Sequence, residues 1–286
     1  MESVLHAKDF VSPYYDSVFS GKYTLRLLIK SIFASLAVID SDAGDLLALK
    51  HWPLHDTLED EAGLSLFKNR YFREIGMLQK IYQAVEISWF TKDFILMPSS
   101  SSSADKPETY WEKIRGSVSA SSCIKNTHCR ELDIDILYKV PKNTLNQLEQ
   151  LFEHMEINHS AGPLLRTLQS MAPPVHKNTF AIINGNILEL AVFHNETLLF
   201  YNSFQCQEAE DYLYFITWIY RELELSASHS PIFLCGLINR SDPVYNLLHQ
   251  YFSKIEFADF KHNFNLPKEE DHLMSHSLIN LLYQAD

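Results

Sequence analysis

The sequence predicts an α/β protein built from two similar halves, each with a mixed sheet in which a three-stranded antiparallel meander continues into parallel crossovers. Three observations predict it. Strand-like segments come in threes at residues 23–51 and again at 179–201, each triplet is followed by alternating helix and strand, and Pro173-Pro174 separates the two runs. We therefore expect residues 1–172 and 173–286 to form the two halves.

The first half begins with its meander. Residues 23–30 and 33–40 form leucine-rich and β-branched strands, and a turn at 41–44 leads to a third strand at 46–51. A helix is expected over 58–82, because apolar residues recur there every three or four positions. The further elements predicted are strands at 85–90 and 93–97, a loop at the serine run 99–103, a helix at 106–114, a strand at 132–140, and helices over 145–155 and 164–171.

The second half opens on a hairpin signal. Asn184-Gly185 lies between strand-like residues 179–183 and 187–193, and both turn residues tolerate positive φ. The elements predicted after it are strands at 197–201, 232–235 and 255–260, and helices at 207–225, 244–252 and 273–283. The order of three strands, helix, strand, helix thus occurs twice.

Composition excludes several classes of function. Thirty-six acidic against 24 basic side chains leave a net charge of -12, which disfavours non-specific nucleic-acid binding. The eight glycines never stand within six residues of each other, which excludes a Walker A loop, a dinucleotide-binding turn and a nucleophile elbow. No Cys-x-x-Cys pair, signal-peptide pattern or long apolar stretch is visible, so we expect a cytoplasmic protein with no membrane span and no nucleic-acid partner.

Three segments carry a resemblance to a known family: Tyr201-Asn202-Ser203-Phe204, Glu210-Asp211-Tyr212-Leu213-Tyr214 and Phe233-Leu234-Cys235-Gly236. Together with the duplicated order over residues 23–283, they resemble an uncharacterised bacterial family, domain of unknown function 3822. Its members adopt an actin-like ATPase fold, in which two RNase H-like halves (βββαβα duplicated, with mixed sheets) face each other across a cleft. The resemblance implies this fold rather than a function, since the activity of the family is not established.

The same resemblance locates the positions at which related proteins hold a nucleotide. In the nucleotide-binding members of the wider actin-like superfamily, Asp-x-Gly turns supply backbone amides and a carboxylate for phosphates and Mg²⁺. Here the first turn, at Ser31, has neither residue, the second, at Asn184 and Gly185, has no carboxylate, and the adenosine segment keeps only Gly236. We expect these four residual cleft positions to hold no cofactor, and the alternative is an ATPase with non-standard phosphate loops.

The helix over 207–225 is the main candidate for an interaction surface, although burial against the opposing half or a loop is favoured over a protein partner. Its first turn is acidic, which stabilises the positive end of the helix dipole, and apolar residues lie on two of its sides. Both sides must be buried, the second one against the opposing half, a loop or a partner. The residues expected to mark an interaction surface are Asn202, Asp211, Tyr214 and Trp218, of which Asn202 and Asp211 also suit a capping role.

The function these observations favour is a catalytically inactive interaction or scaffold module with an unidentified protein partner. The pattern is similar to the degenerate actin-like cytoplasmic domains of secretion and pilus-assembly systems, a likeness of fold alone. The oligomeric state stays open, and enzymatic activity is not expected.

A metal-dependent RNase H-like hydrolase is a second alternative. Asp133 and Asp135 lie two apart in a predicted strand, so both carboxylates would share a face, as a metal site requires. An exposed sheet face with Ile134 and Ile136 turned inward is favoured instead, and the first strand, residues 23–30, lacks the aspartate that such nucleases need.

Two further groups have metal-binding side chains. His272 and His276 stand four apart in the last predicted helix, and Cys123, His128 and Cys129 lie close in sequence. Neither spacing is that of a standard site, so a solvated helix face and free thiols in a loop are favoured, and no metal is expected.

Overall fold

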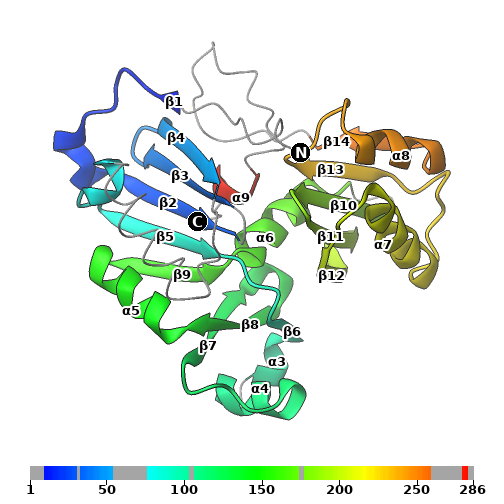
Figure 1. Cartoon of the computed structure of the whole chain (residues 1–286), viewed down its shortest axis with the longest axis horizontal. Helices are drawn as coiled ribbons and strands as arrows, with labels where there is room; N and C mark the ends of the chain where they lie inside the picture. Colours follow the sequence, from blue (N-terminus) through cyan, green and yellow to red (C-terminus); the bar gives the residue numbers. More distant parts are fainter. Residues whose placement is uncertain are drawn as a thin grey trace.

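The computed structural model describes residues 10–30, 33–53, 76–102, 106–173, 177–258 and 279–282, which form three sheets and the helices around them (Figure 1). The strands are β1 (Phe10–Val11), β2 (Thr24–Ile29), β3 (Phe33–Asp40), β4 (Asp45–Pro53), β5 (Ala84–Trp89), β6 (Phe94–Pro98), β7 (Ser122–Cys129), β8 (Ile134–Pro141), β9 (Met155–His159), β10 (Lys177–Asn184), β11 (Ile187–His194), β12 (Thr197–Gln205), β13 (Ile232–Gly236) and β14 (Ile255–Phe257). The α-helices are α3 (Ser99–Ser102), α4 (Pro107–Arg115), α5 (Lys142–Leu151), α6 (Ala161–Met171), α7 (Ala209–Glu222), α8 (Pro243–Tyr251) and α9 (Ile279–Leu282), and the 3₁₀ helices are η1 (Ser17–Lys22), η3 (Gly76–Gln79) and η4 (Arg130–Leu132).

Two of the sheets have one topology. The first sheet has the order β1-β4-β3-β2-β5-β9 and the second the order β12-β11-β10-β13-β14. In each, the first two hairpins are antiparallel, and two later strands add in parallel beside the first strand of the meander. Apart from the short β1, both sheets therefore run third, second, first, fourth, fifth, which confirms the predicted duplication.

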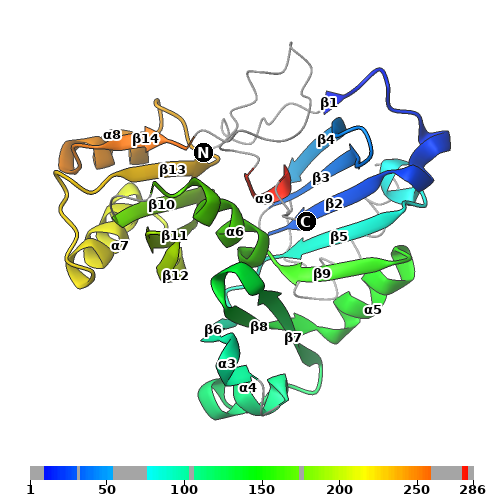
Figure 2. The ribbon, with the colours of Figure 1, turned by 180° about the vertical axis from the view of Figure 1, so that it is seen from behind.

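The third sheet, β6-β8-β7, is inserted in the chain between β5 and β9, and Figure 2 shows it below the other two. The sequence predicted β6 and β8 but placed β7 in a loop, which is wrong. The mostly polar β7 pairs with β8 over its whole length, and its side chains alternate only weakly in burial. A strand with so little apolar alternation has no clear period-two signal.

Three other predicted elements need correction. The helix predicted over 145–155 ends at Leu151, and strand β9 over 155–159 was not predicted, because its alternation of apolar and polar residues is only five residues long. The serine run forms α3 over 99–102 instead of a loop. Of the helix predicted over 58–82, residues 58–75 lie outside the described residues, 76–79 form η3, and the side chain of Tyr82 donates a hydrogen bond back to the Met77 carbonyl at 2.9 Å.

The two hairpins of the second sheet use different turns. Asn184 pairs with Ile187, so the loop residues are Gly185 and Asn186 rather than Asn184 and Gly185. Only Gly185 has a positive φ, 61°, as a type II′ turn requires. The next loop, Asn195-Glu196, has positive φ at both residues, 48° and 57°, which is the type I′ pattern without a glycine.

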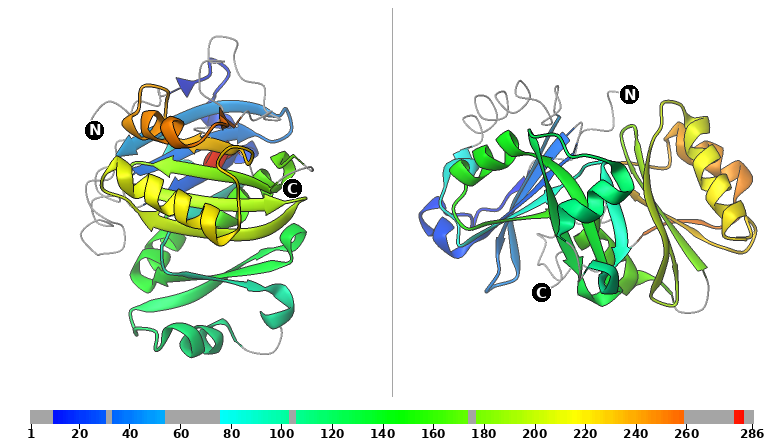
Figure 3. Two further views of the ribbon diagram at one scale, coloured as in Figure 1. Left: turned by 90° about the vertical axis from the view of Figure 1, so that its right-hand side faces the viewer. Right: turned by 90° about the horizontal axis from the view of Figure 1, so that it is seen from below.

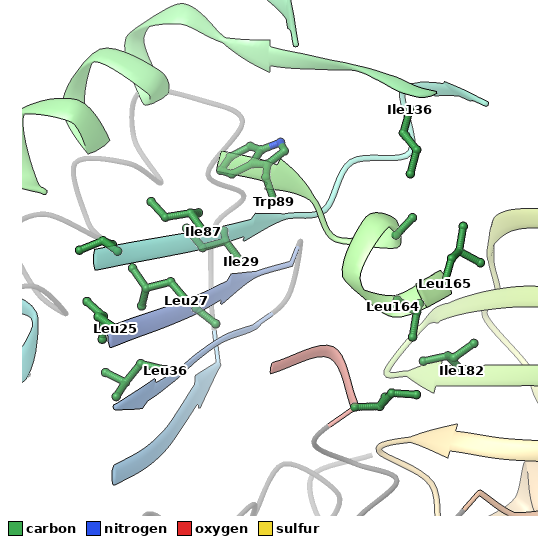
Figure 4. Packing of buried hydrophobic residues seen from close by; sticks show 14 of the residues in the cluster. Leu25, Leu27, Ile29, Leu36, Ile87, Trp89, Ile136, Leu164, Leu165 and Ile182 are labelled. Carbon is green, nitrogen blue, oxygen red and sulfur yellow. The ribbon is translucent and has the colours of Figure 1, made fainter. Parts of the chain in front are cut away.

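One hydrophobic cluster runs through all three sheets. Its members include Leu27 and Ile87 from the first sheet, Ile136 from the third and Ile182 from the second, with α6 between them (Figure 4). Leu164, Leu165 and Leu168 of α6 are fully buried. The helix is thus a wedge shared by the three sheets, while the division of the chain at Pro173-Pro174 stays a prediction.

A second cluster lies on the opposite face of the second sheet, under α7 and α8. Figure 3 shows both helices on the side that points away from the first sheet. The alternation of β11 separates the two clusters, because Ala191 and Phe193 join the first while Leu188 and Leu190 join the second. Side chains at odd positions of β11 therefore face the first sheet.

Gly236, at the end of β13, is a position that only glycine fits. Its φ is 89°, and a Cβ there would lie 2.4 Å from the Ile183 carbonyl oxygen and 2.9 Å from Asn184 Oδ1. We expect Gly236→Ala to lower the free energy of unfolding by about 3 kcal/mol, from strain and backbone displacement. Gly21→Ala is the matched control, because nothing lies within 4 Å of its added Cβ. Urea titrations of both variants test this, and equal stability of the two contradicts it.

Candidate functional site

A buried ion pair lies where the three sheets meet. Lys30 follows β2 at its carboxyl end, and its Nζ donates to Oε2 of Glu189 on β11, with side-chain exposures of 1% and 0%. Tyr201 on the neighbouring β12 donates its hydroxyl to the other carboxylate oxygen, Oε1, at 2.8 Å. The Lys30 ammonium also lies 4.8 Å from the ring centroid of Phe90. A charge from the first sheet is therefore neutralised by a charge from the second.

The strand pattern places both charges. Glu189 occupies an odd position of β11 and so faces the first sheet, while Lys30 stands at the point where the chain turns from β2 into β3. Buried charges are tolerated when they are paired and their remaining hydrogen bonds are made, which Tyr201 helps to do here. Burial and the adjacent Glu189 raise the pKa of Tyr201 well above its ordinary value, so this hydroxyl keeps its proton.

His159, at the end of β9, borders the same cluster. It is fully buried, its Nδ1 accepts the backbone N–H of Ala161 at 3.2 Å, and its Nε2 lies 3.0 Å from the Thr91 carbonyl. Burial lowers the pKa of His159 to about 4, so the ring is neutral at pH 7 and Nε2 carries the proton. Both ring nitrogens form hydrogen bonds with backbone groups. This histidine therefore orients the start of α6 rather than acting as a base.

Three of the four residual cleft positions, Asn184, Gly185 and Gly236, lie together where β10 and β13 end, near Glu189 in the second sheet. Asn184 is 2% exposed, and its Nδ2 has no hydrogen-bond partner among the described residues. The Gly185 carbonyl accepts the hydroxyl of Tyr212, and the N–H of Leu237, next to Gly236, donates to Ile183 at 2.7 Å. Ser31 lies outside the described residues.

Apolar side chains from α9 and from the segment after β13 pack against the first sheet. Leu281 of α9 is 5% exposed and belongs to a cluster with Leu28 and Phe33 of the first sheet, against which Leu237, just after β13, packs. Figure 1 shows α9 between the first and second sheets. Within the described residues, the chain's own hydrophobic groups thus lie between the start of β3 and the segment that follows β13.

The two aspartates considered for a metal do not share a strand face. Asp133 precedes β8 in a left-handed conformation, φ 52°, and only Asp135 is in the strand. Asp135 is 2% exposed, and its Oδ1 accepts the Asn126 amide at 3.0 Å, so the exposed sheet face favoured from the sequence is also wrong. The sequence missed the turn because η4 ends between two apolar residues, Leu132 and Ile134.

Asp135 also forms part of an arrangement that superficially resembles a catalytic triad. His128 Nδ1 lies 3.0 Å from Asp135 Oδ1 and 3.4 Å from Ser99 Oγ. A proton relay requires the acid and the nucleophile on opposite ring nitrogens. Both contacts are made to Nδ1, so this geometry does not activate the serine.

The other metal candidates are not brought together. Cys123 and Cys129 lie at opposite ends of β7, about 20 Å apart at the usual rise of a strand, instead of in a loop. No group of three or more metal-binding side chains occurs within the described ranges. His272 and His276 lie outside those ranges.

The start of α7 is fixed by its own acids. Glu208 and Asp211 form a reciprocal capping box, in which the Asp211 carboxylate accepts the backbone N–H of Gln207 at 2.8 Å and of Glu208 at 3.2 Å. These two hydrogen bonds lower the pKa of Asp211. Asn202 does not cap the helix, because its Oδ1 accepts the neighbouring Ser203 N–H at 2.9 Å.

The second apolar side of α7 is not buried against the first sheet. Tyr214 is 63% exposed and Trp218 is 36% exposed. Phe204 of β12 stacks on Phe215 at 4.3 Å between centroids and meets Trp218 edge-on at 6.2 Å. We call the surface formed by Phe200, Phe204, Tyr214, Phe215 and Trp218 the aromatic shelf.

The repeated sheet order and the wedge helix between the sheets define the actin-like class of folds. The chain belongs to the family described as protein of unknown function (DUF3822), which matches residues 15–255. A solved structure from Bacteroides thetaiotaomicron VPI-5482, described as a protein with actin-like ATPase fold and unknown function, is similar at a TM-score of 0.72 and 18% identity, covering 85% of this chain and 93% of that one.

A second solved structure, the PilM-PilN type IV pilus biogenesis complex, is similar at a TM-score of 0.64 and 12% identity over 90% of this chain and 96% of that one. No curated protein matches the sequence. None of the helices in the described part of the chain is long and apolar enough to cross a membrane. The comparisons thus establish the family and the fold.

The Lys30–Glu189 pair yields a prediction about stability. Glu189→Gln leaves the Lys30 ammonium buried without its counter-charge, and we expect a loss of about 3–5 kcal/mol in the free energy of unfolding. The double variant Lys30→Met, Glu189→Gln removes both charges and should recover most of this loss, since Gln still accepts from Tyr201. Guanidinium titrations of the wild type, of Lys30→Met and Glu189→Gln alone, and of the double variant measure the coupling, and additive losses contradict it.

His159 yields a prediction about pH. The unfolded histidine binds a proton near pH 6.5 but the folded one only near pH 4, so the unfolded state gains protons first as pH falls. On lowering the pH from 7 to 4.5, the free energy of unfolding of the native sequence should fall by about 2–3 kcal/mol more than that of His159→Gln. Urea unfolding at both pH values tests this, and parallel losses in the two proteins contradict it.

Proposed function

We propose that this protein is a catalytically inactive actin-like module of the bacterial cytoplasm that binds another protein. The observation that carries the proposal is Lys30. It flanks the first predicted phosphate turn, where a free ammonium would attract a nucleotide, and here it is desolvated and neutralised by Glu189. A triphosphate recruited to Lys30 would have to displace a carboxylate and leave that charge buried and unpaired.

Two other features support this interpretation. The cluster that joins the first sheet to the segment after β13 contains Phe33, Leu237 and Leu281, whose side chains offer no hydrogen bonds to phosphates. Tyr214 and Trp218 of the aromatic shelf are exposed on the opposite side of the second sheet, and tyrosine and tryptophan are enriched in protein interfaces. The similar PilM structure was solved with PilN, and we extend a protein-binding role to this chain by analogy of fold.

One observation favours the alternative, a nucleotide-binding protein with non-standard loops. The Asn184 Nδ2 is buried without a partner beside the second hairpin, so one donor remains for a ligand there. The two functions differ in what nucleotide does to the melting temperature: a nucleotide-binding protein is stabilised by it, and the inactive module is not.

The nucleotide prediction follows directly. We expect ATP or ADP with Mg²⁺, each at about 2 mM, to leave the melting temperature of the full chain unchanged, because a ligand stabilises only what it binds. Differential scanning fluorimetry tests this, with Mg²⁺ alone as the control. A Mg²⁺-dependent rise of several degrees that saturates below about 1 mM would support the alternative instead.

The aromatic shelf predicts a separable effect of Trp218. Trp218→Ala should abolish capture of the partner from lysate of the native cell while lowering the stability by only about 1 kcal/mol, because the ring is partly exposed. Tyr251→Ala, at a 56% exposed aromatic residue of α8, is the matched control and should keep the partner. A loss of about 3–5 kcal/mol would place Trp218 in the core and remove it from the interface.

A further inference from the structure

The edge of the second sheet beside the aromatic shelf is an open strand. β12 ends the sheet on this side, next to β11, and no other strand pairs with it among the described residues. A register shift at Val192/Phe193 interrupts its start, so its regular part runs over residues 200–205. Such an edge presents unpaired backbone donors and acceptors to another chain.

The direction of these groups follows from the pairing. The Cys206 N–H donates to the Asn186 carbonyl, so in this antiparallel ladder the residues at even positions bond to β11 and those at odd positions point outward. The hydrogen bonds of Ser203 agree, because its N–H is accepted by the Asn202 side chain instead of by β11. Tyr201, Ser203 and Gln205 therefore direct their backbone amides outward, and that of Ser203 is bound by the Asn202 side chain.

This edge lacks the devices that usually prevent pairing. β12 contains no proline, lysine, arginine or acidic residue. Natural edge strands are commonly protected by such residues, by coverage or by bulges, and only the bulge at the start of β12 is of this kind. The Asn202 amide, bound to the Ser203 N–H, is a polar cover that an incoming carbonyl can replace.

The surroundings determine the chemistry of an added strand. On the α7 side it would run along Phe204 and Trp218, which suit apolar side chains at every second position. The acids that flank β12 in the chain or belong to α7 are Glu196, Glu208, Glu210, Asp211 and Glu222. The bases are Arg221, which is 3.6 Å from Glu222, Lys177, which donates to the Leu223 carbonyl after α7, and Lys92, which donates to Gln205. The excess is negative, so basic side chains suit the other positions.

A second copy of this chain fits less well. An antiparallel pair of β12 strands would bring two copies of the same acidic α7 edge together, with Asp211 of one helix towards Glu222 of the other. Like charges in that position repel, and each chain carries a net charge of -12.

We propose that β12 accepts an extended, basic segment of a partner protein as an additional strand, with its apolar side chains on the aromatic shelf. This inference rests on the proposed function and names the class of partner. Backbone hydrogen bonds to residues 201–205 supply affinity, and the shelf and the surrounding acids supply selectivity.

The test uses the full chain and a fluorescein-labelled, end-capped peptide of about ten residues in which valine and lysine alternate. Fluorescence anisotropy should show saturable binding that weakens as NaCl rises from about 50 to 300 mM. The valine–glutamate peptide, and the valine–lysine peptide with every backbone nitrogen methylated, should bind at least about tenfold more weakly. Equal binding of either control, or no binding of the first peptide at about 1 mM protein, would overturn the proposal.

Variants locate the site. Trp218→Ala should weaken peptide binding about tenfold, while Asn202→Ala, which uncovers the Ser203 N–H, should strengthen it about threefold. Tyr251→Ala should leave it unchanged, and circular dichroism checks the fold of each variant.

Capture of a lysate partner that requires Trp218, but with no effect of Asn202→Ala and no peptide binding, would leave the proposed function standing and exclude strand addition. A concentration-dependent dimer in sedimentation, lost in Trp218→Ala, would assign the edge to a second copy and contradict the proposal.

Discussion

The buried pair of Lys30 and Glu189 is the constraint on which the arrangement of the sheets depends. Two desolvated charges are stable only at contact distance and with their remaining hydrogen bonds satisfied. The need for contact holds the end of β2 against Glu189 of β11. The Tyr201 hydroxyl satisfies the remaining carboxylate oxygen of Glu189. Hydrophobic packing alone tolerates small shifts between layers, whereas a buried ion pair does not, so the pair sets the register between the first and second sheets.

The surrounding core follows from that register. The wedge helix α6 starts directly beside the pair, where His159 binds the Ala161 N–H, and its leucines then pack between all three sheets. A neutral histidine is favoured here, because a charged imidazolium would lose its hydration on burial and would also be repelled by the Lys30 ammonium. In the described part of the chain, hydrophobic side chains and the Lys30–Glu189 pair therefore fill the interior between the sheets.

The sequence predicted the duplicated order because its signals are local. Leucine-rich and β-branched runs, the Asn-Gly hairpin and the amphipathic spacing of α7 each report on neighbouring residues. It failed where structure is set by distant partners: β7 is a strand because β8 pairs with it, and β9 because β5 does. Lys30 and Glu189 were missed for the same reason, since 159 positions separate them and each alone is an ordinary charged residue of a strand or its end. A charge at an odd position of the otherwise apolar β11 was the one available signal.

The consequence for binding is a division between the two faces of the second sheet. Glu189, Ala191 and Phe193 of β11 and Tyr201 of β12 are buried between the sheets, so a partner cannot reach them without separating buried charges. The opposite face is covered by α7 and α8 (Figure 3), and among the described residues β12 forms an unpaired edge of the sheet next to the exposed Tyr214 and Trp218 of α7. Those two features are adjacent because β12 leads directly into α7 through the capping box at Glu208 and Asp211. The same short connection that begins the helix therefore brings unpaired amides, aromatic rings and carboxylates onto one surface, and that juxtaposition is what makes the outer edge, rather than the interior, the part of this fold suited to recognition.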